Sequence, residues 1–478
     1  MQTVGRASRI QARADGTLAS RLAVRCSVFA VASAALTFAT NPARAQASDI
    51  KSAFAPAVAA AQAAKTASGT GADDETAKFK YFDSLGEKGW IVPRPSTAES
   101  VIADTGGVRS ALAEYGIGFL GLGSYSFFVD TLQQSGGRQV YNGQQPTFGS
   151  STTFAASLNL DLYGVPNAQI TAAGTRLTTT WRPFGPPAFS LQRLNYYQSF
   201  FNGKLELKVG YTTNNYEFFG TSVGGNIISG TLGPNANILY QAGMARTPLT
   251  APAINVRWNG PDNIYVKSGV QRSISPDGSE AEHDANPSGF RFRTPKASAL
   301  FINEVGYKRL ASGDELSLWV RGGFLYNDSP YTIFGTTRTS SNAAFALLAD
   351  TQLLKTDPVY PERGIYGGVS FLKGDPNVDG TDQYYEGRLY GVGVIPQRPK
   401  DFISLVYTHN KFSDRVFAIT QARGFPAVDR INNLTVSYSI HLARGVFLNN
   451  GLTYGDHAAT SPITRPVLVF ASALAVVF

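Results

Sequence analysis

Polar and apolar residues alternate one by one along most of this chain, from Ile117 to the C-terminus. In one clear example, Thr435, Ser437 and Ser439 alternate with Val436 and Tyr438. A period of two places the polar set on one face of a β-strand and the apolar set on the other. We therefore expect an all-β fold in which each strand faces two different environments.

The connections between these segments alternate between short and long. The short ones combine Gly, Pro, Asn and Asp, as tight hairpins do, and they include 164–167, 202–203, 260–262, 312–314, 396–400 and 443–445. The long ones span 131–151, 212–251, 272–296 and 411–432. Short turns on one rim and long loops on the other are typical of a bacterial outer-membrane barrel.

Counting the alternating segments predicts a closed transmembrane antiparallel β-barrel of about sixteen strands. The second strand is expected over 152–163, and the tenth over 341–354, although Ala343–Leu354 also fits a helix. No stretch reaches the roughly 18 consecutive apolar residues of a transmembrane helix. A soluble β-sandwich explains the alternation but not the regular succession of short and long connections.

The N-terminus has the layout of a secretory signal peptide. A basic lead with five arginines precedes the apolar stretch Val28–Ala39, and Ala43-Arg44-Ala45 is a small-x-small cleavage pattern. Removing residues 1–45 removes six Arg and one Asp, so 42 basic and 34 acidic residues become 36 and 33. The net charge falls from +8 to +3, which gives no reason to expect a nucleic-acid partner. The single Cys is removed as well.

Residues 46–100 differ from the rest of the chain. Their first part, Ser52–Ser68, is rich in Ala and contains Pro56. We expect a periplasmic leader or tether there, and a barrel domain over 101–478.

The long loop 212–251 is the third on its rim, the position at which sixteen-stranded porins fold a loop into the lumen. Its candidate constriction residues are Asn214, Asn215, Tyr216 and Glu217. The alternation places a set of polar and aromatic side chains on the inner face of the strands as pore-lining candidates: Arg193, Asn195, Tyr197, Glu206, Lys208, Arg257, Trp319 and Arg321. Amides and charged groups can hydrogen-bond sugar hydroxyls, and aromatic rings can pack on the faces of sugar rings.

One segment fits the spacing of a calcium-binding loop. Asp375, Asn377 and Asp379 are followed by Gly380 and, six residues further, by Glu386. Strands rather than helices are expected on both sides. The alternative is an extracellular loop that is simply rich in Asp and Gly.

Two stretches resemble the carbohydrate-selective porin family (OprB type). Asp104–Ile117 is similar to the motif that leads into the first strand of that family, with Thr105 where the family usually has Trp. Gly387–Gly391 and Ile395–Asp401 are similar to a late hairpin of the family. The resemblance implies a short N-terminal periplasmic helix, a sixteen-stranded barrel, and diffusion of glucose and similar small sugars.

We therefore expect a porin in the outer membrane of a Gram-negative bacterium, with sugars as substrates, lipid around it, and no cofactor required beyond calcium in the loop above. The C-terminal Phe478 resembles the signal that barrel-assembly machinery reads, and a homotrimer is the usual porin assembly. A general or anion-preferring porin remains the alternative within transport. An outer-membrane barrel enzyme and a structural or adhesive barrel are the alternatives from other classes.

Overall fold

The computed structural model describes residues 72–91, 94–132, 139–181, 188–221, 237–459 and 464–478. The expected signal peptide, 1–45, and residues 46–71 of the expected leader lie outside these ranges. No helix in the described part of the chain is long and apolar enough to cross a membrane.

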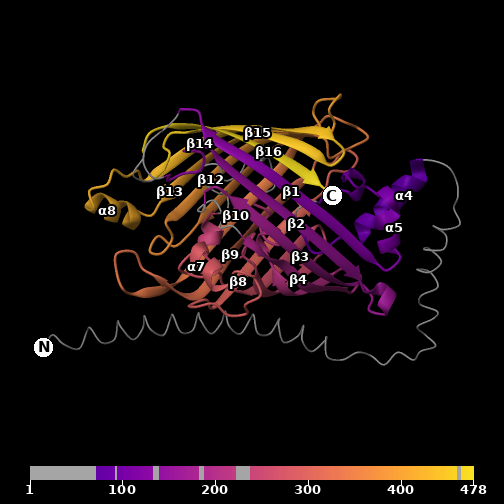
Figure 1. Ribbon diagram of the computed structural model, residues 1–478, viewed down its shortest axis with the longest axis horizontal. Helices are drawn as coiled ribbons and strands as arrows, with labels where there is room; N and C mark the ends of the chain where they lie inside the picture. Colours follow the sequence, from indigo (N-terminus) through magenta and orange to yellow (C-terminus); the bar gives the residue numbers. More distant parts are fainter. Residues whose placement is uncertain (1–71, 92–93, 133–138, 182–187, 222–236, 460–463) are drawn as a thin grey trace. The chain divides into compact units, whose positions relative to one another are not determined.

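Sixteen antiparallel strands form one closed barrel in which each strand pairs with its neighbours in sequence, and β1 pairs with β16 (Figure 1). This confirms the expected fold class. The strands are β1 Ile117–Asp130, β2 Thr147–Asn159, β3 Ala168–Thr179, β4 Ala188–Phe200, β5 Leu205–Thr212, β6 Ala251–Asn259, β7 Ile264–Arg272, β8 Ala299–Arg309, β9 Leu318–Thr332, β10 Thr339–Lys355, β11 Gly364–Lys373, β12 Thr381–Val392, β13 Phe402–Phe412, β14 Arg430–Ala443, β15 Val446–Gly455 and β16 Val467–Val477.

The second strand lies a few residues earlier than its expected span of 152–163. The residues after it form a short 3-10 helix, η3 (Asp161–Tyr163), in place of the end of a strand. The cause is local, because the Asp161 carboxylate accepts a hydrogen bond from the Asn167 amide at 2.5 Å. That bond closes the turn before β3, as Asp side chains commonly do.

The tenth segment is a strand and not a helix. Its outward side chains Phe345 and Leu347 are exposed, as expected on a lipid-facing surface, but its inward side chains Ala346 and Leu348 are apolar too. The inward face is apolar because a loop inside the barrel packs against it. The alternation therefore fails at β10 for a tertiary reason.

The two rims carry different helices (Figure 1). On the rim of short turns lie α4 (Ala72–Ser84), α5 (Val108–Ala113) and the 3-10 helices η1 (Thr97–Glu99) and η2 (Thr105–Gly107). The long loops carry the 3-10 helix η5 (Asn214–Tyr216), α6 (Asn237–Gln241), α7 (Ser279–Ala285) and α8 (Asp414–Ala422). The Lys78 ammonium of α4 lies 2.6 Å from the carboxylate of Asp104, beside α5. That contact and two hydrogen bonds from Ser110 outweigh burial and lower the pKa of Asp104 to about 2.

Residues 72–100 belong to the barrel unit, which begins at residue 71. The boundary expected at residue 100 is therefore corrected for this part of the leader. The Asp83 carboxylate accepts hydrogen bonds from Ser96 Oγ at 2.6 Å and from the Thr97 amide at 2.7 Å. These bonds close a loop, 83–97, whose described residues enter the barrel.

We predict that Asp83→Ala loosens this loop. Losing its hydrogen bonds costs about 1–2 kcal/mol, so trypsin should cleave after Lys88 roughly tenfold faster. The measurement is the rate of fragment formation by the folded protein. Glu75→Ala, which changes an exposed acid on the same helix α4, is the control and should cleave like the wild type. Equal rates for Asp83→Ala and the wild type would contradict the prediction.

Candidate functional site

The inserted segment, residues 85–91, runs along the inner wall of the barrel from β2 to β9. At its start, the Leu85 carbonyl accepts hydrogen bonds from Ser157 Oγ at 2.5 Å and from Gln169 Nε2 at 3.1 Å. At its end, Ile91 packs in a buried apolar cluster with Tyr265 and Trp319. The segment therefore has fixed contacts at both ends.

Glu87 places a negative charge of this segment among buried cations. One carboxylate oxygen lies 2.8 Å from Arg193 Nε, and the other lies 3.7 Å from Lys208 Nζ. Arg94 lies 3.6 Å away. Burial alone raises the pKa of Glu87, but the three cations outweigh it and the pKa lies below its usual value. Glu87 is therefore ionised and compensates the inward charges of β4 and β5.

The loop between β5 and β6 is described over residues 213–221 and 237–250, and these parts pack against the same wall. Asn214 donates a hydrogen bond to Gln271 of β7 at 2.8 Å and accepts one from Asn255 of β6 at 2.7 Å. Glu217 forms an ion pair with Lys208 at 2.5 Å, and its carbonyl accepts a hydrogen bond from Lys267. The loop is thus held to inward-facing side chains of β5, β6 and β7.

An apolar cluster anchors the rest of the described loop. Its members from the loop are Phe218, Phe219, Ile238, Leu239, Ala242 and Met244. Inward side chains of five strands complete the cluster: Leu300 and Ile302 of β8, Leu325 of β9, Ala344, Ala346 and Leu348 of β10, Leu372 of β11 and Tyr384 of β12. Each buried Leu or Phe contributes about 1.5–3 kcal/mol, which is enough to hold a loop inside a barrel.

The inserted segment and this loop meet at one aromatic stack. The rings of Trp90 and Tyr216 are parallel within 6° and their centroids are 4.7 Å apart. The Ile91 amide donates a hydrogen bond to the Tyr216 carbonyl at 3.1 Å. The guanidinium carbons of Arg94 and Arg193 lie 4.3 and 4.8 Å from the Trp90 ring.

Two inward residues of β9 connect this strand to the loop and to strands on either side. Arg321 donates to the carbonyl of Gly220 at 3.1 Å and forms an ion pair with Asp350 of β10 at 2.7 Å. Arg388 of β12 shares Asp350, also at 2.7 Å. Trp319 donates its indole N–H to the Tyr265 hydroxyl at 2.9 Å.

All twelve residues expected at the pore or its constriction lie on the inner wall or on the loop that packs against it. Most of them are buried beneath that loop or the inserted segment: Arg193, Asn195, Tyr197, Lys208, Asn214, Glu217, Trp319 and Arg321. Asn215, Tyr216, Glu206 and Arg257 are half-buried. Only these four of the twelve retain the exposed surface that a passing solute needs.

Sequence reasoning missed Glu87, Trp90 and Arg94, because the whole stretch 46–100 was interpreted as a leader. A local signal was present. The Ala-rich composition ends at Ser68, and aromatic and charged residues are frequent from Phe79 to Ile91. Such a change favours a packed segment over a tether.

The four calcium candidates are not brought together. Glu386 lies on β12, where it forms an ion pair with Arg388 at 2.7 Å. Within the loop, Asp375 accepts hydrogen bonds from Asn377, and Asp379 accepts one from the Asp375 amide at 3.0 Å. Burial raises the pKa of Asp379 to about 7, so that carboxyl is only partly charged at neutral pH.

In the described ranges, no three or more His, Cys, Asp or Glu side chains are grouped so as to hold a metal ion. The expected four-residue site is therefore wrong, because Glu386 is not grouped with the other three residues. Calcium binding by Asp375, Asn377 and Asp379 alone stays a prediction.

Two solved structures of one protein have a similar fold. A structure of Pseudomonas putida OprB at high pH matches with a TM-score of 0.66 at 17% identity, covering 82% of this chain and 99% of that chain. A structure of the same protein at low pH matches with a TM-score of 0.51 at 16% identity, covering 80% and 98%. At these identities the likeness shows the fold, which is that of a porin. No curated protein matches the chain.

The family model described as "Carbohydrate-selective porin, OprB family" matches residues 132–478. The chain therefore belongs to the carbohydrate-selective porin family, as the two motifs indicated. It is an outer-membrane porin of a Gram-negative bacterium through which carbohydrates diffuse. The short turns then lie in the periplasm and the long loops outside the cell.

We predict that Glu87→Gln makes the channel more selective for anions. The substitution keeps the shape of the side chain but leaves Arg193 and Lys208 without one of their countercharges. The chloride-to-potassium permeability ratio should rise roughly twofold or more, measured as the reversal potential in a KCl gradient. Glu315→Gln, at an exposed acid in a periplasmic turn, is the control. An unchanged reversal potential in Glu87→Gln would show that Glu87 does not act on the permeating ions.

Proposed function

We propose that small neutral sugars, glucose among them, cross the barrel at a constriction formed jointly by the loop 213–250 and the inserted segment. These two elements pack along the inner wall from β2 to β12. The passage runs beside them, where Glu206, Tyr216 and Arg257 keep part of their side chains exposed.

The observation that carries this proposal is the stack of Trp90 on Tyr216. Both rings are half-buried, so each keeps some exposed surface. Arginine side chains lie against the Trp90 ring. An aromatic surface beside hydrogen-bond donors suits a sugar, whose ring has apolar faces and whose edge carries hydroxyls.

The pairing of charges supports a neutral solute. Glu87 compensates Arg193, Glu217 compensates Lys208, and Asp350 lies between Arg321 and Arg388. Paired buried charges attract a free ion less than an unpaired row of cations would. The general or anion-preferring porin is therefore the second candidate, which the experiment below separates from the first.

The family and the fold are those of porins, which are not enzymes. We propose that transport involves no chemical step and no cofactor, with the concentration gradient as the driving force. We also propose that outer-membrane lipid surrounds the barrel, that barrel-assembly machinery inserts it, and that three copies associate. Phe478 supports the assembly step, because its backbone pairs with Gly121 of β1 where the barrel closes.

We predict that purified protein forms channels in planar bilayers whose current falls when glucose or maltose is added. In Trp90→Ala the loss of the stack should weaken the sugar block about two- to tenfold and raise the open conductance. Trp258→Ala is the matched control, because Trp258 lies on the outward face of β6.

A channel that sugars do not affect would leave the general porin as the better proposal. Absence of any channel would contradict diffusion itself. If Trp258→Ala and Trp90→Ala weaken the block equally, the stack has no role in recognising the sugar.

A further inference from the structure

Part of the loop between β7 and β8, residues 286–297, lies against the outer surface of the barrel and not above its lumen. The Leu191 amide of β4 donates a hydrogen bond to the Ser288 carbonyl at 2.9 Å. The Tyr211 hydroxyl of β5 donates one to the Phe290 carbonyl at 2.7 Å. Tyr211 belongs to the outward set of β5, so these contacts place the segment on the lipid-facing side.

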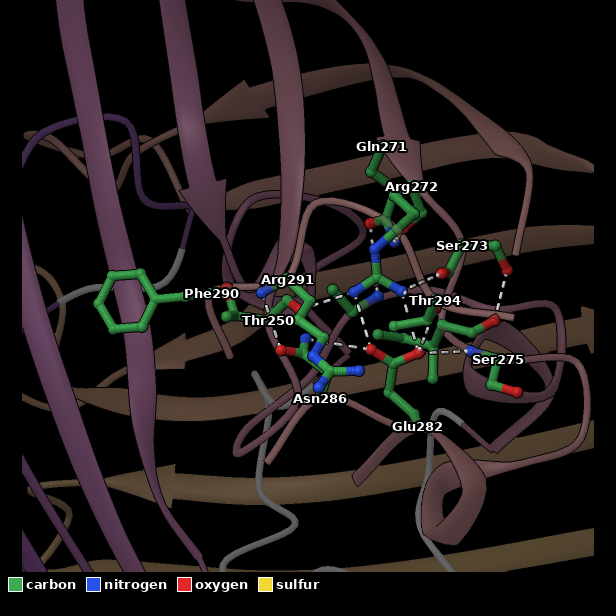
Figure 2. Close-up of polar contacts among 12 residues, drawn as sticks. Thr250, Gln271, Arg272, Ser273, Ser275, Glu282, Asn286, Phe290, Arg291 and Thr294 are labelled. Carbon is green, nitrogen blue, oxygen red and sulfur yellow. Dashed lines mark hydrogen bonds and ion pairs between the residues drawn. The ribbon is translucent and has the colours of Figure 1, made fainter. Parts of the chain in front are cut away.

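A buried ion pair holds the segment in this position (Figure 2). Two guanidinium nitrogens of Arg272 contact the two carboxylate oxygens of Glu282 at 3.0 and 2.7 Å. The same carboxylate accepts hydrogen bonds from Thr294 Oγ1 at 3.1 Å and from the Ser275 amide at 2.9 Å. Arg272 and Glu282 are both buried, and a bidentate pair of this kind strongly restricts geometry.

The network extends to the residues that face outward. Asn286 donates to Glu282 at 3.3 Å and accepts from the Arg291 amide at 2.9 Å. Figure 2 shows the Phe290 side chain pointing away from the polar cluster. The next residues, Arg291, Phe292 and Arg293, are all exposed. A rigid base thus presents two aromatic rings and two cations at the outer surface.

Between this segment and the strands lies an apolar groove of about 470 Å³. We call it the outer groove. Its apolar wall includes outward side chains of β5, β6 and β7 and an aromatic ring of the segment: Val209, Tyr211, Pro252, Ile254, Val270 and Phe292. The volume lies within the range of small-molecule sites, roughly 300–1,000 Å³. Arg293 also lines the groove, so a cation stands beside the apolar surface.

Two of the three exposed cations of the segment are available to a ligand. Lys296 forms an ion pair with Asp277 at 2.9 Å. Arg291 and Arg293 have no ion-pair partner in the part of the chain that the structure describes. Arginine binds phosphate through two parallel hydrogen bonds, and basic residues near a membrane surface attract anionic head groups.

We propose that the outer groove binds a phosphate-bearing lipid of the outer leaflet, with an acyl chain in the groove and the phosphate at Arg293 and Arg291. Charge complementarity selects this occupant. A chain of apolar carbon fills the space between Phe292 and the strands, and the head group reaches the extracellular rim, where the loop carries its arginines. The site is separate from the passage for sugars, because it lies on the other side of the barrel wall.

The test measures binding of diphosphorylated lipid A, as a defined probe, to the full-length mature protein in detergent by native mass spectrometry. Arg291→Gln with Arg293→Gln should weaken binding about tenfold. The matched control is Arg338→Gln with Arg423→Gln, which removes two exposed arginines from other loops on the same rim and should bind like the wild type. Val270→Trp, which fills the groove without changing charge, should weaken binding as well.

Dephosphorylated lipid A should bind the wild type more weakly than diphosphorylated lipid A does. The two double variants should bind dephosphorylated lipid A with equal affinity. Unchanged binding of lipid A to the Arg291/Arg293 variant, or equal losses in the two double variants, would overturn the proposal. If Val270→Trp instead changes the number of copies per particle and leaves lipid binding intact, the groove is a contact between copies and the lipid proposal fails. Sugar block of the channel should be the same in all these variants, so the result is independent of the transport function.

Discussion

The structure depends on closure of the sheet. Within a bilayer, a backbone N–H or C=O without a partner costs several kcal/mol, so a spanning sheet must have no edge. Here β1 and β16 pair over the range from Leu122 with Val477 to Asp130 with Val469. Because every strand then has two neighbours, the wall is rigid, and loops can be attached to either of its faces.

On the inner face, parts of the chain narrow the lumen of the sixteen-stranded barrel. Two pieces of chain are placed against it. The loop 213–250 is held mainly by apolar contacts with β8 to β12, and the inserted segment mainly by hydrogen bonds and ion pairs with β2 to β5. Breaking one buried ion pair is expensive because it leaves the other charge unpaired. Glu87 therefore matters to both elements, since Lys208 contacts it and Glu217 alike.

The outer face shows how the same wall can support a second role. Residues 286–297 add an apolar groove and two cations to the lipid-facing surface, while the Arg272–Glu282 pair keeps the loop from collapsing. Over most of the outer surface of a barrel, any apolar side chain can contact lipid, so many different sequences are tolerated there. A rigid arginine-bearing segment beside a groove is a more specific arrangement.

Much of this could be read from the amino-acid sequence, because the relevant physics is local. A period of two, together with turns rich in Gly, Pro, Asn and Asp, predicted all sixteen strands, and the inward set that it defined includes Arg193, Lys208 and Arg321. Where the period weakened, at β10, the cause was a contact with the loop that lies far away in the sequence. What only the tertiary structure decided is which inward residues stay accessible and that the chain before the first strand enters the lumen. Glu87 meets Arg193 and Lys208 across more than a hundred residues of sequence, and no local pattern encodes such a contact.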